Sequence, residues 1–368
     1  MNTKYSLADC PDVITRIRFV TTAGFLLYNE LSVSVRGIQA YGTLKSVFIG
    51  NTLEETMLHK RNGYLLKVGG VRIMTMKKAR LIYNPTSGRE EAKRRLASIL
   101  QRLDEGGIEA SCHATTGEGD ATREASEAVD RGYDLIIAAG GDGTLYEVIN
   151  GMAQKENRPP LGIFPLGTTN DFARAMGIPR HWEDYCDMVI RQETRPVDLG
   201  LVNDRYFINI AGGGTLTELT YEVPSKLKTM IGQLAYYMKG MEKMTNLAPQ
   251  ELYIRANGQE DIHDEFMLFL IANTNSVGGF EKLAPGATID DGLFDVIALK
   301  KCNLAEMIRL VRLALRGEHL NDKKIIHFQT DYMEVNSPGE VLLNLDGELG
   351  GQLPATFRNL PHHIQIFR

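Results

Sequence analysis

The sequence predicts an α/β protein in which a doubly wound parallel sheet is followed by a mainly β, sandwich-like domain. Between residues 81 and 164, short apolar runs alternate with stretches of helical periodicity, which indicates repeated βα units and a parallel sheet. Around Arg195 the pattern changes to short strand-like runs separated by turns. We therefore expect domains at 76–195 and 196–368, with the last residues able to return to the first domain.

The composition is that of an ordinary globular protein. Of 368 residues, 43% are hydrophobic and 24% are charged, and no segment is long and apolar enough to span a bilayer. The net charge of −5 gives no overall field that would attract nucleic acid, so any anion site must be local. Four cysteines without CxxC spacing or close pairing indicate neither a zinc site nor a disulfide framework, and we expect a reducing cytoplasm.

Residues 1–75 differ from the rest of the chain. They contain short apolar pieces, but no sustained helical or strand period and no secretory signal pattern. Met74 and Met76 stand just before the first clear strand, and we expect the natural chain to begin at one of them, after a translated leader. The alternative is an extension that is made and poorly ordered. N-terminal sequencing of the natively expressed protein tests this, and a mass that includes Met1 would refute it.

The elements of the first domain follow in order along the chain. The run Leu81–Tyr83 predicts a first strand, and the apolar face of residues 96–103 predicts a helix that stops at Gly106 and Gly107. The later elements are a strand at 108–113, an Ala-rich helix at 121–129, a strand at 135–139, a helix from 145 onward and a strand at 161–164.

The turn Gly140-Gly141-Asp142-Gly143-Thr144 joins a buried strand to a helix. Glycines let the main chain approach a ligand closely, and the free N–H groups of a new helix favour anionic oxygens, so a phosphate fits there. Asp142 would repel that phosphate unless a divalent cation lay between them, and Mg²⁺ bound to phosphates and one or two carboxylates supplies that cation. The alternative is an ordinary strand-to-helix turn, since Asp-Gly is a common turn pair.

Three more polar turns follow predicted strands, at residues 84–88, 114–117 and 165–171. In an open parallel sheet, ligands bind beyond the carboxyl ends of the strands. The sequence therefore predicts that these turns meet the glycine turn at one edge of the sheet.

The second domain shows six strand-like runs and two candidate helices. The runs are Tyr206–Ile210, Glu251–Ala256, Phe266–Ile271, Leu293–Leu299, Tyr332–Val335 and Val341–Leu345. A helix at 226–244 mixes lysines with apolar and aromatic residues, and a helix at 304–316 carries Arg309, Arg312 and Arg316 beside an apolar face. Basic amphipathic helices contact membranes peripherally, although a helix packed on the β domain would show the same apolar spacing.

Four ordered motifs carry a family resemblance: Asn84-Pro85-Thr86-Ser87-Gly88, the glycine turn, Gly167-Thr168-Thr169-Asn170-Asp171-Phe172-Ala173-Arg174, and Leu345-Asp346-Gly347-Glu348. They resemble the soluble diacylglycerol kinase family, which also contains sphingosine and ceramide kinases, and most closely its bacterial members of Gram-positive type. The resemblance covers the chain from Met76 to the C-terminus. The glycine turn alone is shared with NAD kinases and phosphofructokinases, whereas the Asn-Pro-x-Ser-Gly opening and the Gly-Thr-Thr-Asn-Asp-Phe-Ala stretch resemble lipid kinases.

The resemblance implies ATP at the converging turns, with Mg²⁺ as its cation. Phosphoryl transfer needs positioning, neutralisation of charge by metal and a base for the acceptor's proton. The residues that the resemblance assigns to the nucleotide are Asn84, Pro85, Thr86, Ser87, Gly88, Thr116, Gly141, Asp142, Gly143, Thr144, Glu147 and Thr169. Taken singly, Thr116 and Thr169 could instead be loop or capping hydroxyls.

Asp346 and Glu348 are the candidate catalytic carboxylates beside Asp142. In an extended segment, residues i and i+2 point the same way, so both could face the γ-phosphate. The resemblance implies Glu348 as the general base on the lipid hydroxyl, and Asp346 as the partner of Asp142 in a network of Mg²⁺ and water. The alternative is an Asp-Gly hairpin on the surface. Which of Asp346 and Glu348 is the base stays open, because their positions couple them.

A second cation site is implied at residues 288–295, where three carboxylates cluster within a turn. Hard cations bind such oxygens together with backbone carbonyls. By resemblance, Asp291 would hold a structural Mg²⁺ with the carbonyls of Thr288 and Leu293. A solvated turn is the alternative.

These features predict a cytoplasmic lipid kinase, peripherally associated with the inner face of the membrane and able to form a homodimer. It would phosphorylate diacylglycerol to phosphatidic acid, and we expect no nucleic-acid partner. Three alternatives stay open: a kinase of another lipid alcohol such as a sphingoid base, an NAD kinase-like enzyme, and a non-catalytic nucleotide or lipid sensor. The late Asp-Gly-Glu motif disfavours the second, and a sensor need not keep Glu348.

Overall fold

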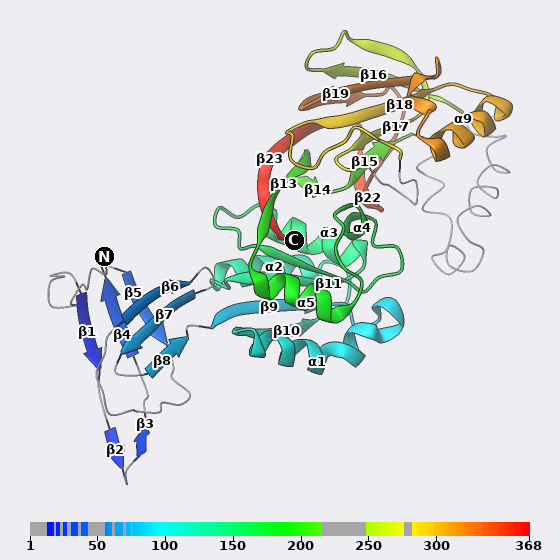
Figure 1. The fold of residues 1–368 in the computed structure, drawn as a ribbon. Helices are drawn as coiled ribbons and strands as arrows, with labels where there is room; N and C mark the ends of the chain where they lie inside the picture. Colours follow the sequence, from blue (N-terminus) through cyan, green and yellow to red (C-terminus); the bar gives the residue numbers. More distant parts are fainter. Residues whose placement is uncertain are drawn as a thin grey trace, which may run out of the picture. The chain divides into compact units, whose positions relative to one another are not determined.

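The structure is a computed structural model, which describes residues 76–214, 248–275 and 282–368 together with the backbone of short strands between residues 13 and 74 (Figure 1). The chain forms two compact units, residues 1–77 and 78–368. The predicted basic helix at 226–244 lies outside the described residues.

The first unit contains short antiparallel pairings. The sequence indicates no fold here, because none of these runs is long enough to show a period. The strands form a sheet in the order β1-β4-β5, a β2-β3 ribbon and a sheet in the order β6-β7-β8. Their bounds are β1 (Val13–Ile17), β2 (Val20–Thr22), β3 (Phe25–Leu27), β4 (Leu31–Val35), β5 (Ile38–Gly42), β6 (Thr56–Lys60), β7 (Gly63–Val68) and β8 (Val71–Met74).

The second unit begins with the expected doubly wound sheet, in the strand order β10-β9-β11-β12-β23. The pairs β9/β11, β11/β12 and β12/β23 are parallel. The strands are β9 (Lys77–Tyr83), β10 (Ile108–Ala114), β11 (Leu135–Gly140), β12 (Leu161–Pro165) and β23 (Ala355–Phe367). The helices are α1 (Glu91–Glu105), α2 (Asp120–Asp130), α3 (Asp142–Ala153), α4 (Asp171–Ala175) and α5 (Trp182–Arg191), with a 3₁₀ turn η2 (Ser87–Glu90) before α1. α1 contacts α5 and α2 contacts α3, and the two pairs cover opposite faces of the sheet (Figure 1).

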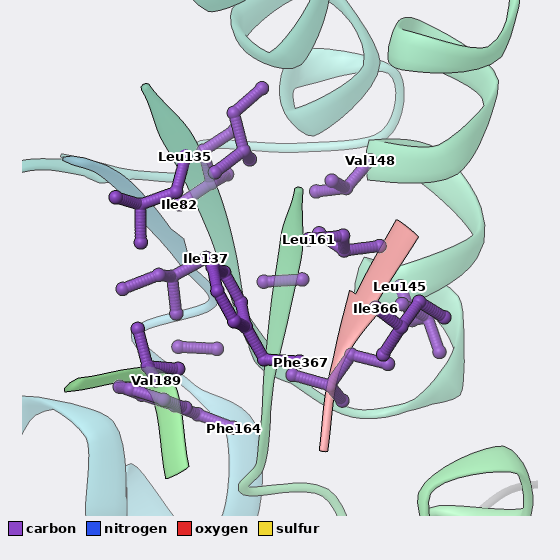
Figure 2. Close-up of a cluster of buried hydrophobic side chains, with 14 of the residues drawn as sticks. Ile82, Leu135, Ile137, Leu145, Val148, Leu161, Phe164, Val189, Ile366 and Phe367 are labelled. Atoms are coloured by element: carbon purple, nitrogen blue, oxygen red, sulfur yellow. The ribbon is translucent and has the colours of Figure 1, made fainter. Parts of the chain in front are cut away.

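The buried side chains of this sheet show why its strands lie in this order. All six residues of β11 are buried, as expected for a strand covered by helices on both faces. Ile137 lies among side chains from the neighbouring strands, and Leu145 and Val148 of α3 close the cluster (Figure 2). The last strand also contributes, because Ile366 pairs with Leu161 and is fully buried. The end of the chain is therefore part of the parallel sheet.

The remaining strands form the β-rich part, which has its own buried cluster. They continue the sheet into one 15-stranded arrangement. Their bounds are β13 (Thr194–Val202), β14 (Arg205–Phe207), β15 (Ile210–Gly213), β16 (Gln250–Ala256), β17 (Ile262–Ala272), β18 (Phe294–Lys300), β19 (Ile325–Thr330), β20 (Tyr332–Asn336), β21 (Leu342–Leu345) and β22 (Glu348–Gln352). Helix α9 (Leu304–Arg316) and the 3₁₀ turn η4 (His319–Asn321) connect β18 to β19.

One strand prediction in this part is wrong. The run Tyr206–Ile210 is divided between β14 and β15, with Ile208 and Asn209 in neither strand. The amides of Ile208, Asn209 and Ile210 donate to the carboxylate of Asp346. Because a distant side chain binds these N–H groups, the strand is interrupted where the local pattern is continuous.

No helix in the described part of the chain has the length and apolar character needed to cross a membrane.

Candidate active site

The four predicted turns meet at the carboxyl edge of the parallel sheet. Thr115 N donates to Tyr83 O at 2.9 Å, so the loop after β10 lies beside the end of β9. Asn84 N donates to Ala139 O at 3.1 Å, which links the loop after β9 to the end of β11. Leu166 N and Gly167 N both donate to Gly140 O, at 2.9 and 3.0 Å. These bonds hold the loops in one row.

Two glycine turns touch through their main chains. A Cβ on Gly167 would stand 2.4 Å from the Cα of Gly141, so no side chain fits between these two backbones. A Cβ on Gly140 would stand 2.4 Å from Oγ1 of Thr144 and would collide with that side chain. Gly141 is the N-cap of the 12-residue helix α3, so the free N–H groups of its first turn open at this edge.

The loop after β9 is folded onto itself. Oδ1 of Asn84 accepts from the amide of Thr86 at 3.0 Å and from its hydroxyl at 2.8 Å. Ser87 Oγ donates to Leu166 O at 3.3 Å, which joins this loop to the turn after β12. Gly88 has φ 54°, a left-handed conformation that favours glycine, and Pro85 is half-buried. The predicted segment 84–88 therefore lies beside the glycine turns.

Asp142 is the first residue of α3 and is half-buried. Burial, together with the nearby carboxylate of Asp171, raises the pKa of its carboxyl to about 6. The main-chain amides of residues 170–172 oppose this rise. Sequence reasoning did not assign Asp171, although it lies in the quoted Asn-Asp motif and begins the short helix α4. Arg174 Nη2 bonds both Asp171, at 2.9 Å, and the carbonyl of Thr169, at 2.8 Å.

The Asp346-Gly347-Glu348 segment is a tight hairpin turn, so the prediction of an extended segment is wrong. Asp346 has φ 53° and Gly347 has φ 98°, the pair of left-handed residues that a two-residue turn between antiparallel strands favours. Because the chain reverses here, the rule that residues i and i+2 share a face does not apply. Asp346 points back into the protein, and Glu348 opens β22 as an exposed residue.

The Asp346 carboxylate accepts three main-chain N–H groups. Oδ2 accepts from Ile208 at 2.7 Å, and Oδ1 accepts from Asn209 and Ile210, each at 2.9 Å. Burial raises the pKa of Asp346 to about 6 against these bonds, and the charge of Asp142 contributes to the rise. The two aspartates are therefore within electrostatic reach of one another across the turns.

Glu348 faces the glycine turn. An ideal Cβ on Gly143 would stand 3.0 Å from Oε1 of Glu348, so this carboxylate lies against the first turn of α3. Tyr146, one turn further along α3, was not predicted. Burial raises the pKa of Tyr146, the Arg205 guanidinium opposes this, and Asp346 and Glu348 add to the rise. Arg205 also donates from Nη1 to Leu349 O at 2.6 Å, next to Glu348.

Thr116 precedes α2, and the side chain of Glu147, a residue of α3, reaches the start of α2. The amide and hydroxyl of Thr116 both donate to Oδ2 of Asp120, each at 2.8 Å. Oε2 of Glu147 accepts from Ala121 N at 3.0 Å. The Thr169 side chain, in the turn before α4, is exposed.

The second predicted metal loop is a separate feature. Asp291 is exposed, its Oδ1 accepts from Leu293 N at 3.0 Å, and its Oδ2 accepts from the hydroxyl of Thr288. The loop is anchored by Asp198, which is fully buried and accepts from Gly292 N at 2.7 Å. In the described ranges, no three His, Cys, Asp or Glu side chains gather closely enough to hold a metal ion. A cation at this loop would thus depend on one carboxylate and on main-chain carbonyls.

Comparison with known proteins agrees with this arrangement. Residues 78–202 match the family model described as "Diacylglycerol kinase catalytic domain", and residues 219–368 match the "YegS C-terminal NAD kinase beta sandwich-like domain". The diacylglycerol kinase of Bacillus subtilis (strain 168) is 59% identical over 294 residues, which cover 79% of this chain and 96% of that protein. The chain belongs to the diacylglycerol kinase family. It is therefore a kinase, and the expected family and fold class are confirmed.

Further relatives are also named diacylglycerol kinases. A diacylglycerol kinase of Staphylococcus haemolyticus is 50% identical over 288 residues, covering 78% of this chain and 87% of that protein. A solved structure of a diacylglycerol kinase from Bacillus anthracis str. Sterne superimposes with a TM-score of 0.67 at 27% identity. That match covers 80% of this chain and 98% of the solved chain.

Proposed function

We propose that this kinase transfers the γ-phosphate of ATP to the free hydroxyl of diacylglycerol, which gives phosphatidic acid. The observation that carries the proposal is the placement of the Glu348 carboxylate against Gly143. A carboxylate at that position can accept a proton from a hydroxyl that approaches the terminal phosphate. The lipid acceptor is supported by the named relatives, which are diacylglycerol kinases.

The nucleotide would lie along the row of turns. The N–H groups of the first turn of α3 are the natural partners of its phosphates, because they are unpaired within the helix and carry the positive end of its dipole. The 84–88 loop and the turn after β12, which Ser87 joins, would form the sides of this site. Thr116, Glu147 and Thr169 would contact the rest of the nucleotide.

Asp142 and Asp346 are the residues that would hold Mg²⁺. Two carboxylates whose pKa values are both raised to about 6 by burial, and which repel one another, are stabilised by a divalent cation, and carboxylate oxygens suit Mg²⁺. When bound, the ion neutralises charge on the phosphates. The residues' own task is positioning: Asp346 fixes the 208–210 amides beneath the hairpin, and the hairpin presents Glu348.

We also propose that a structural Mg²⁺ binds at Asp291, with the carbonyls of Thr288 and Leu293. The support is the local turn, in which the Asp291 carboxylate is exposed and already oriented by Thr288 and Leu293. Mg²⁺ binding that is unchanged by Asp291→Ala would contradict this assignment.

Helix α9 is the described candidate for membrane contact. Its inner face, with Met307 and Leu310, packs in a buried cluster. Leu304 and Leu315 are exposed, at 45% and 56%, and Arg312 is exposed between them. An outward helix face that combines leucines and arginines fits an anionic lipid surface.

Glu348→Gln is the decisive test of the reaction. The full chain is assayed with ATP, Mg²⁺ and diacylglycerol in mixed micelles, and phosphatidic acid is measured beside ATP affinity. We expect the variant to bind ATP like the wild type and to lose at least 100-fold in kcat, since general-base catalysis contributes about 10²–10⁴-fold. Glu340→Gln, an exposed glutamate before the hairpin, is the matched control and should keep wild-type activity.

The other outcomes separate the alternatives. Turnover of a sphingoid base or of NAD in place of diacylglycerol would keep the kinase and replace the acceptor. Nucleotide binding without turnover of any acceptor would favour a sensor. Full activity of Glu348→Gln would remove Glu348 as the base and leave the role to Asp346 or to a residue outside the described ranges.

A further inference from the structure

The loop after β10 carries Thr116, whose hydroxyl proton is already used in a hydrogen bond within the protein. The hydroxyl of Thr116 donates to Oδ2 of Asp120 at 2.8 Å, and its main-chain N–H donates to the same oxygen at 2.8 Å. Asp120 is 4% exposed, whereas Thr116 is on the surface of the turn. The two bonds from Thr116 lower the pKa of Asp120 to about 2, so this acceptor stays ionised at any physiological pH.

Both carboxylate oxygens of Asp120 have further partners. Nε2 of His113 lies 3.2 Å from its Oδ2, and Arg123 bonds its Oδ1. Nδ1 of His113 lies 3.3 Å from Glu124, which in turn accepts from Arg80 Nε at 2.6 Å. This network ties the carboxylate to β9, β10 and α2, so that it cannot turn away from the loop.

The hydrogen bond to Asp120 determines whether the Thr116 hydroxyl can donate to a ligand or only accept from it. A hydroxyl has one proton to donate and two lone pairs that accept. Because the proton of Thr116 is directed to Asp120, the hydroxyl offers only lone pairs to a ligand. Glu147 adds a second acceptor at the start of α2, where Oε2 already accepts from Ala121 N. This corner therefore favours donor groups and disfavours phosphate oxygens, which have no proton to give at neutral pH.

We propose that Asp120 is a positioning residue that orients the Thr116 hydroxyl as an acceptor for a donor on the nucleoside half of the nucleotide. That donor is a ribose hydroxyl or the exocyclic amine of the base. The inference rests on the nucleotide site proposed above, and it adds a direction: the nucleoside lies toward the start of α2, and the phosphates lie toward Gly141 and Gly143.

The test measures equilibrium binding by calorimetry, with the full chain and no lipid. The probes are ATP, 2′-deoxyATP, 3′-deoxyATP and purine riboside triphosphate, which lacks the exocyclic amine. We expect the wild type to bind one of these analogues about 3- to 10-fold more weakly than ATP, the effect of one neutral hydrogen bond. Thr116→Val should weaken ATP by a similar factor and show no further loss with that analogue.

Asp120→Ala distinguishes positioning from a purely structural role. With its proton released, the Thr116 hydroxyl can rotate, so the variant should lose the discrimination between ATP and the analogue. Thr116→Ser keeps the hydroxyl and should retain that discrimination, which shows that the loop still folds. The matched control is Asp130→Ala, which removes a carboxylate from the other end of α2, where Asp130 pairs with Lys155.

Two results would overturn the proposal. One is a wild type that binds all four nucleotides equally. The other is an Asp120→Ala protein that loses thermal stability but keeps the wild-type ratio of affinities. Failure of the lipid-kinase proposal looks different, because a chain that binds ATP but makes no phosphatidic acid still permits this test. A wild type that binds no nucleotide would refute both.

Discussion

Asp142 should cost the folded protein stability at neutral pH. Burial and the neighbouring Asp171 raise the pKa of its carboxyl from 3.8 to about 6. The folded state therefore holds this proton more tightly than the unfolded chain does. Between about pH 4 and pH 6 the folded state binds more protons, so the free energy of unfolding falls as the pH rises through this window and stays low above it.

The size of this loss of stability follows from the difference between the folded and unfolded pKa values of Asp142. A pKa that is higher by about two corresponds to on the order of 3 kcal/mol of unfolding free energy lost at pH 8. Asp142→Asn removes the ionisation. The free energy of unfolding of Asp142→Asn should exceed that of the wild type by near zero below pH 4 and by on the order of 3 kcal/mol at pH 8. The pKa of about 6 already includes the opposing hydrogen bonds from the amides of residues 170–172, so these bonds are part of this magnitude.

Urea unfolding of wild type and Asp142→Asn at pH 4.5 and pH 8, in buffer with EDTA, measures this effect. Chelation matters because a bound divalent cation would favour the ionised carboxylate and mask the cost. Asp104→Asn, an exposed aspartate of α1, is the control. A variant less stable than the wild type at pH 8, or a stability difference that is the same at both pH values, would refute the reasoning.

Two further predictions concern the glycine turns and α9. Gly167→Ala places a Cβ 2.4 Å from the Cα of Gly141, so ATP affinity should fall at least tenfold. In Gly286→Ala, outside these turns, the Cβ would meet only Oδ1 of Asp295, at an ordinary contact distance of 3.8 Å, and this control should bind ATP normally by calorimetry. Joint replacement of Arg312 and Arg316 by Glu should weaken sedimentation with phosphatidylglycerol vesicles and leave ATP affinity unchanged. Equal sedimentation of variant and wild type would remove α9 from the membrane contact.

Much of the nucleotide edge could be predicted because it follows from local pattern and parallel topology. Strands that run parallel end at the same edge, so the turns after 83, 114, 140 and 165 must lie together once the βα alternation is recognised. The glycine and acid residues of these turns are visible in the sequence, and so is the family resemblance that they carry.

The features that were predicted wrongly or missed depend on contacts between residues that are distant in the sequence. Asp346 binds amides about 137 residues away in the chain, and that contact decides both its direction and the break between β14 and β15. Tyr146 and Asp120 have no local signal, because a tyrosine inside a helix and an aspartate at a helix start are common. Asp171 could have been found, since it follows a strand end within a recognised motif.

The long strand β23 determines how this kinase can move. With β13 it makes one ribbon whose ends lie in different cores, since Thr194 pairs with Phe367 and Val202 pairs with Phe357. The two cores therefore have no free tether between them, and any change in their separation must twist this ribbon. Its pairing is irregular only between Val197 and Leu199, where a bulge lets strands coil more strongly. Relative motion of the two cores should therefore be a twist of this ribbon, with small amplitude and a fixed direction.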